Sequence, residues 1–72
     1  MKDFFCVKAL DVGEMWVCIR ARKASQIEER FPLMSIIEDY EVYLSSERIA
    51  KIKQIGTYSL EEIPKPIADR LT

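Results

Sequence analysis

The hydrophobic positions are densest in the first third of the chain, in two short runs on either side of a turn. Phe4–Leu10 and Met15–Arg22 are rich in aromatic and β-branched residues and in cysteine. Aromatic and β-branched residues are enriched in strands. Asp11, Val12 and Gly13 separate the runs, and Gly13 can take the positive φ that a tight turn requires. The pattern therefore predicts a β-hairpin.

The register of this hairpin is predicted from the face on which each side chain falls. Pairing Leu10 with Glu14 around a three-residue loop gives one entirely apolar face and places Cys6 beside Cys18. The apolar face then comprises Phe5, Val7, Ala9, Met15, Val17, Ile19 and Ala21. The opposite face comprises Phe4, Cys6, Lys8, Leu10, Glu14, Trp16, Cys18 and Arg20. A slip of one residue would mix the two sets, so we expect the first register.

The residues after the hairpin predict a short helix and then a third strand. Ser25 and Glu28 have the spacing of a capping box, which satisfies free N–H groups in the first turn of a helix. Pro32 limits this helix to about two turns, because proline disfavours helix at the residue before it. Met34–Glu38 is β-prone and predicts a strand, followed by an irregular or extended stretch to Leu44.

The last part of the chain predicts helices. Ser45 or Ser46 can cap a helix that runs to Gly56, with isoleucines along one face. The connector that follows has a single helical turn near 59–62. Pro66 suits the first turn of a short terminal helix, Ile67–Leu71.

The predicted order is therefore β-β-α-β-α with a further short terminal helix. The expected class is α+β: a three-stranded antiparallel or mixed sheet, made of the hairpin and one more strand, with two or three short helices on one face. Seventy-two residues predict one domain, residues 1–72. A core of that size is marginal, and such chains often depend on a disulfide, a metal or a partner.

Composition narrows the class of function. The chain is 49% hydrophobic and 32% charged, with a net charge of −1, so it fits a folded protein with no overall attraction to nucleic acid or anionic membranes. Histidine is absent, which excludes Ser–His and Cys–His catalysis. We therefore expect no enzyme and no cofactor. Asp3 and Lys8 interrupt the first apolar run, so we expect neither a signal peptide nor a membrane span, and a cytoplasmic location.

The order of short motifs resembles that of small bacterial proteins of uncharacterised function. The shared pattern is a strand ending in Arg-Ala, a capped helix, a Phe-Pro pair and a strand. It is carried by Trp16–Arg22, Ser25 with Glu28, Phe31-Pro32, Ile37–Asp39, Thr57–Leu60 and Pro64. The resemblance implies a bacterial cytoplasmic protein and no particular activity or site residue.

The two cysteines are the first candidates for chemistry. We expect Cys6 and Cys18 to be reduced side chains packed in the sheet, because thiols stay reduced in the cytoplasm. A cross-strand disulfide is the alternative that their predicted pairing allows. A metal site shared between two chains, or a redox role, is a further alternative, although the chain has no CxxC spacing.

The outer face of the hairpin is the predicted partner site. An apolar patch there would mark an interface with another protein or with a second copy of the chain. Its members are Phe4, Cys6, Leu10, Trp16 and Cys18. The alternative is that the C-terminal segment folds over this face. We expect a non-enzymatic interaction module, such as a small subunit, an adaptor or a homodimer, that uses this face or the edge of the hairpin.

Two charged stretches supply alternative functions. The acidic one could serve a small inhibitor or immunity-type protein against a basic partner. Its members are Glu38, Asp39, Glu41 and Glu47. The basic run Arg20, Arg22 and Lys23 could contact phosphate in a nucleic-acid accessory protein, but three cations are few, and nucleic acid is not the expected partner.

Overall fold

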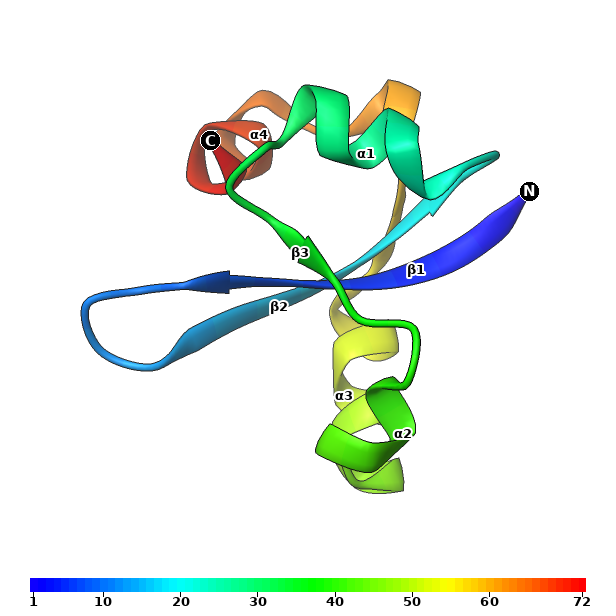
Figure 1. The fold of residues 1–72 in the computed structure, drawn as a ribbon, viewed down its shortest axis with the longest axis vertical. Coiled ribbons are helices and arrows are strands. Elements are labelled where there is room, and N and C mark those ends of the chain that lie inside the picture. Colours follow the sequence, from blue (N-terminus) through cyan, green and yellow to red (C-terminus); the bar gives the residue numbers. More distant parts are fainter.

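A twisted β-hairpin forms the centre of the computed structural model, which describes residues 1–72 (Figure 1). Strands β1 (Lys2–Ala9) and β2 (Glu14–Ala21) pair antiparallel along their whole length. Strand β3 (Ser35–Ile36) lies antiparallel beside β1, and β4 (Thr57–Ser59) lies parallel beside β2. The sheet is therefore mixed, in the order β3-β1-β2-β4. The predicted α+β class is confirmed, while the predicted count of three strands omitted β4.

Helices cover both faces of this sheet. They are α1 (Ala24–Arg30), α2 (Tyr40–Tyr43), α3 (Ser46–Ile55), a 3-10 turn (Leu60–Glu62) and α4 (Lys65–Leu71). Figure 1 shows α1 and α4 on one side of the hairpin and α2 and α3 on the other. The prediction of helices on one face is thus wrong. None of the helices is both long and apolar enough to cross a membrane.

Local sequence signals set most boundaries in the second half of the chain. The Ser45 hydroxyl accepts a hydrogen bond of 3.2 Å from the Arg48 N–H and so caps α3. Gly56, at φ 143°, ends that helix in a conformation that other residues rarely adopt. Pro66 lies in the first turn of α4, where its missing N–H costs nothing. These predictions are confirmed.

Two helical boundaries differ from the prediction. α1 begins at Ala24, and the Gln26 side chain, rather than that of Glu28, accepts a hydrogen bond from the Lys23 N–H at 3.4 Å. The stretch predicted to be extended contains α2, a single helical turn. That turn places Tyr40 and Leu44 on the same side, because residues four apart share a helix face.

The hairpin register differs by one residue from the predicted one. Cys6 pairs with Val17, and Phe5 pairs with Cys18, around the four-residue loop 10–13. Since neighbouring side chains along a strand point to opposite faces, Cys6 and Cys18 lie on opposite faces of the sheet. The prediction that they are neighbours on one face is wrong.

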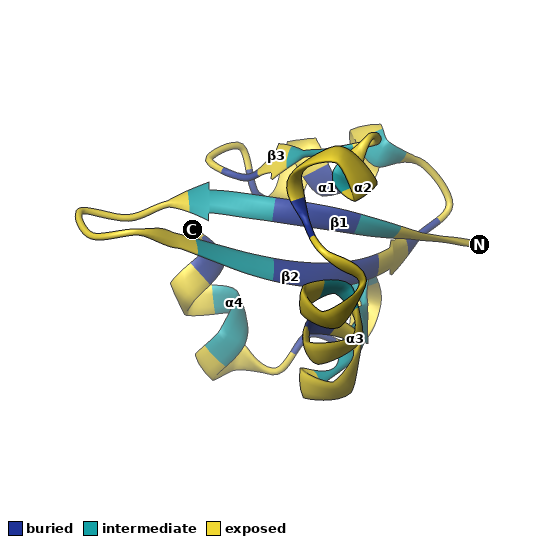
Figure 2. Cartoon of the chain, turned by 90° about the horizontal axis from the view of Figure 1, so that it is seen from below, coloured by how far each residue is buried: buried dark blue, intermediate teal, exposed yellow.

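Each face of the sheet carries its own hydrophobic cluster. The larger one lies under α1 and α4 and comprises Cys6, Val17, Ile19, Ala21, Ile27, Phe31, Met34, Ile63 and Leu71. The smaller one lies toward α2 and α3 and comprises Phe5, Cys18, Leu44 and Ile52. Figure 2 shows that most of the buried residues of β1 and β2 lie in the middle of the two strands. Because both faces are covered, neither face has to be uniformly apolar along its whole length.

Lys8 of β1 forms hydrogen bonds with the C-terminal end of α4. Its Nζ donates to the carbonyl oxygens of Arg70 at 3.0 Å and Thr72 at 2.7 Å. Carbonyls in the last turn of a helix have no partner within the helix. Replacing Lys8 by methionine keeps the apolar stem and removes the donor. We expect the free energy of unfolding, measured by urea denaturation, to fall by about 0.5–1 kcal/mol.

Lys65 is the matched control for this prediction. It starts α4, where a positive charge is unfavourable for the helix dipole, so Lys65→Met is expected to leave stability unchanged or slightly higher. Equal losses for the two variants would show that the Lys8 contact does not stabilise the chain.

Candidate functional site

The five predicted partner-binding residues do not form one surface. Cys6 and Cys18 are fully buried on opposite faces. Phe4 packs against the larger cluster, and Leu10 is 47% exposed in the hairpin loop. Trp16 packs against the smaller cluster and stays half-buried. Of the five, Trp16 is the one that borders a hollow in the surface.

The two thiols are held in their neutral form by burial. Burial raises the pKa of Cys6 to about 12, and the Cys6 Sγ lies 3.7 Å from the Phe4 carbonyl as a weak donor. Burial also raises the pKa of Cys18, against the lowering effect of a hydrogen bond with Thr57. Thiolates, not thiols, attack electrophiles and bind metals. A disulfide between the two is excluded because their Cβ atoms point to opposite faces.

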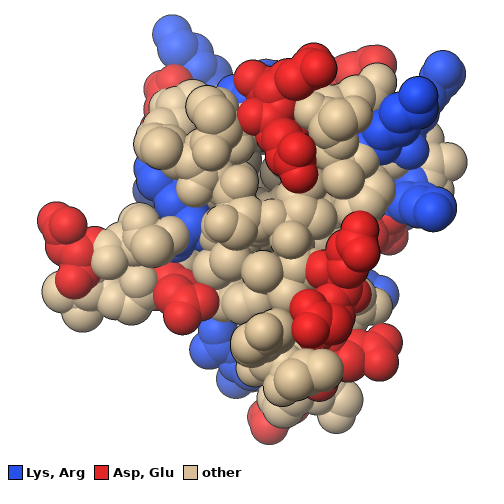
Figure 3. Space-filling view, viewed as in Figure 1, with Lys and Arg blue, Asp and Glu red and all other residues tan.

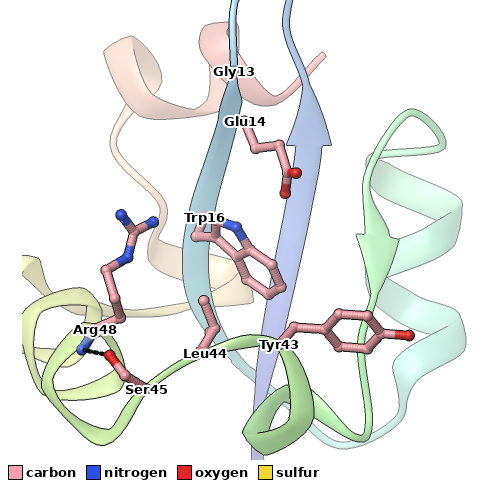
Figure 4. A pocket seen from close by; sticks show the side chains of 7 residues that line it. All are labelled: Gly13, Glu14, Trp16, Tyr43, Leu44, Ser45 and Arg48. Atoms are coloured by element: carbon pink, nitrogen blue, oxygen red, sulfur yellow. Dashed lines mark hydrogen bonds between the residues drawn. The ribbon is translucent and has the colours of Figure 1, made fainter.

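Trp16 lies between two hollows, where the distal half of the hairpin meets α2 and α3. The first hollow has a volume of about 680 Å³ and is lined by Gly13, Glu14, Trp16, Tyr43, Leu44, Ser45 and Arg48 (Figure 4). The second has a volume of about 340 Å³ and is lined by Glu14, Met15, Trp16, Arg48, Lys51, Ile52 and Ile55. We call these lining residues together the Trp16 surface.

Three elements position the side chains of this surface. The register of β2 puts Glu14 and Trp16 on the face covered by α3. The single turn of α2 buries Leu44 and leaves Tyr43 66% exposed at the rim. The Ser45 cap starts α3 so that Arg48 falls in its first turn. Figure 4 shows the Trp16 ring with Arg48 on one side and Tyr43 on the other.

The charged groups of the Trp16 surface are unpaired. The one ion pair of the structure joins Arg20, at the other end of β2, to Asp3 of β1. Arg48, Lys51 and Glu14 therefore have no charged partner within the chain. The surface offers two cations, one carboxylate and exposed apolar area that includes Ile55, which is 77% exposed.

The acidic stretch is fully on the surface. Glu38, Asp39, Glu41 and Glu47 are all exposed, and none forms an ion pair. Figure 3 shows acidic side chains over the region of α2 and the loop before it. Asp39 and Glu41 begin α2, and Glu47 lies in the first turn of α3, positions at which a negative charge favours the helix dipole. The positions of these three residues at helix starts are therefore favourable without any partner.

The basic run is partly neutralised. Arg20 Nε lies 2.7 Å from the Asp3 carboxylate. This hydrogen bond lowers the pKa of Asp3 and raises that of Arg20. Arg22 and Lys23 are exposed, and Arg22 shares the lining of a hollow of about 260 Å³ with the acidic Glu61. The three cations thus do not form a continuous basic surface of the kind that binds phosphate backbones.

No protein-family model, no curated protein and no solved structure matches this chain. The resemblance to small bacterial proteins stays a prediction. The choice among functions therefore depends on the surfaces described above.

Proposed function

We propose that this protein is a small, non-enzymatic cytoplasmic module that binds a partner protein through the Trp16 surface. The observation that supports this most directly is the convergence of Trp16, Tyr43 and Arg48, from three different elements, around two hollows. Tryptophan, tyrosine and arginine dominate the residues that contribute most to protein–protein binding. Hollows beside them can accept a partner's side chains.

The small core also favours a partner. Thirteen of the 72 residues are buried, and they are divided between two faces of one sheet. Tyr43 and Ile55 remain largely exposed at the two ends of the Trp16 surface. Burying such apolar side chains against a partner would stabilise the complex by about 25 cal/mol per Å² of apolar surface removed from water. A partner would therefore add to the little apolar burial that the chain achieves alone.

The chemistry of the side chains favours binding over catalysis. Both thiols are buried and have raised pKa values, and the chain has no histidine to act as their base. Activated nucleophiles need an adjacent base or a lowered pKa.

Affinity capture from the source cells tests this proposal. Trp16→Ala is expected to weaken retention of the specific partner by at least about tenfold, because a central tryptophan commonly contributes 2 kcal/mol or more. Leu33→Ala is the matched control, since Leu33 is 64% exposed and does not line the Trp16 surface. Circular dichroism of both variants checks that the fold persists.

Retention of the same partner by Trp16→Ala at the wild-type level would contradict the proposal. The inhibitor-type alternative makes the opposite prediction. There, retention would survive Trp16→Ala and would fall when Glu38, Asp39 and Glu41 are neutralised, with a strong dependence on salt.

A further inference from the structure

Half of β2 has no strand on its outer side. β4 pairs with Cys18–Arg20 and with no residue before Cys18. The segment Glu14–Val17 pairs with β1 on its inner side and borders the Trp16 surface on its outer side. An edge of this kind presents main-chain donors and acceptors to any chain that lies beside it.

The main-chain groups that face outward can be identified from the pairing. The Phe5 carbonyl accepts a hydrogen bond of 3.0 Å from the Ile37 N–H, so the groups of Phe5 face away from β2. Its partner Cys18 therefore directs its own groups away from β1. Because this direction alternates along a strand, Glu14 and Trp16 also direct N–H and C=O outward. Met15 and Val17 direct theirs to β1.

The second hollow follows this edge. Met15 belongs to one face of β2 and Trp16 to the other, yet both line the same hollow, so it wraps around the edge between them. Its other wall is α3, through Lys51, Ile52 and Ile55. Figure 2 shows α3 and α4 on the side of β2 away from β1, so helices flank this edge.

The flanking helices favour an extended peptide over a second copy of the chain as the partner of this edge. A second copy would have to approach with its own β2 edge, which is flanked by the same helices, so the helices of the two copies would meet before the strands could pair. An extended peptide segment has no such bulk. The unpaired cations Arg48 and Lys51 outnumber Glu14 along the hollow, so a segment with acidic side chains is complementary in charge.

We propose that an extended segment of a partner protein, carrying alternating apolar and acidic side chains, adds to the Glu14–Val17 edge of β2 as a further strand. The inference rests on the proposed function and specifies the mode of binding. Main-chain hydrogen bonds to Glu14 and Trp16 supply affinity, and side chains in the hollow beside Trp16, Arg48 and Lys51 supply specificity.

A displayed library of random peptides of about nine residues, the length of a typical long strand, tests the inference. Panning on the wild-type protein is expected to enrich sequences with alternating apolar and acidic residues. An enriched peptide is then synthesised with N-methyl groups at alternate residues. N-methylation at one set of alternate positions should lower the affinity of the peptide at least about tenfold. N-methylation at the other set should change the affinity little, because only alternate N–H groups of the peptide face β2.

Hydrogen exchange on the wild-type protein gives a second readout. The amides of Glu14 and Trp16 should exchange at least about tenfold more slowly with peptide bound. Those of Met15 and Val17, already bonded to β1, should change less. Glu14→Pro removes an outward N–H, whereas Glu14→Ala removes the same carboxylate and keeps the N–H. We expect the proline variant to bind the peptide about tenfold more weakly than the alanine variant.

Three results would overturn strand addition: no enriched peptides, equal effects of both N-methylated sets, or unchanged exchange at Glu14 and Trp16. Protection of those amides in a peptide-free dimer would identify a second copy as the occupant and would overturn it too. If partner capture still depends on Trp16 in any of these cases, the proposed function stands and this inference alone fails. Hydrogen exchange decides the question even if Glu14→Pro does not fold.

Discussion

Replacing Phe31 by alanine is expected to remove about 3–5 kcal/mol from the free energy of unfolding. The side chain is 1% exposed and lies in the larger cluster, under α1 and α4. The Arg30 guanidinium lies 5.0 Å from the centre of its ring and adds a smaller cation–π contribution. Since a chain of 72 residues has a total stability of about 4–11 kcal/mol, the variant should lose roughly half of it. Urea denaturation followed by circular dichroism measures the change.

Phe5→Ala makes the same test on the opposite face. Phe5 is 2% exposed, and its ring centre lies 4.1 Å from that of Tyr40. Because both clusters pack on β1 and β2, we expect a similar loss and one cooperative transition for each variant. Leu33→Ala, at an exposed position, should change stability by less than about 0.5 kcal/mol. Separate transitions for circular dichroism and Trp16 fluorescence would show that the two faces unfold independently.

The stability of the protein is expected to fall steeply above pH 9 because of Cys6. Burial raises the pKa of its thiol from 9.0 to about 12. The unfolded chain therefore releases this proton at a lower pH than the folded chain does. The contribution of the neutral thiol is complete below pH 9 and is lost as the pH rises toward 12. The expected loss from Cys6 alone is about 1.4 kcal/mol at pH 10 and about 4 kcal/mol at pH 12.

Urea denaturation of the wild type and of Cys6→Ala at pH 8 and pH 10 isolates this effect. All other ionisable groups are present in both proteins, so their contributions to the free energy of unfolding cancel in the comparison. The wild type should lose about 1.4 kcal/mol more than Cys6→Ala between the two pH values. Equal losses would mean that the thiol is not desolvated in the folded protein.

The sequence predicted the hairpin but not its register, and the reason is physical. A register can be chosen from one clean apolar face only when the other face meets water. Here Phe4–Val7 and Trp16–Ile19 are continuous apolar runs, which are typical of strands covered on both sides. Either register then places apolar side chains on both faces of the hairpin. The covering helices decide between them, and these contacts are distant in the sequence.

The missed elements are the shortest ones. β4 has three residues and pairs in parallel with a strand near the other end of the chain, so no local pattern marks it. α2 has four residues, and its alternating Tyr40, Val42 and Leu44 resemble a strand. The spacing of four between Tyr40 and Leu44 was the available signal for a helical turn. The longer and capped helix α3 was predicted correctly.

Of the candidate site, the sequence identified Trp16 alone. The other predicted residues of that face depended on the wrong register, or are too buried to meet a partner. Tyr43 and Arg48 were not predicted because their neighbourhood depends on how α2 and α3 fold back on β2. The Ser45 cap does fix the phase of α3, so the place of Arg48 in its first turn could have been deduced.

The two-sided cover of the hairpin also constrains the kinetics of folding. A hairpin forms in about 1–10 µs. The contacts that the hairpin makes with the rest of the chain join residues far apart in the sequence, since Cys18 pairs with Thr57 and Lys8 donates a hydrogen bond to Thr72. Closing such long loops costs conformational entropy before the contacts that offset this cost have formed. A folding chain therefore passes through states in which the apolar strands are exposed on both faces at once. Association between such chains competes with folding, so the yield of refolding should decrease as protein concentration rises.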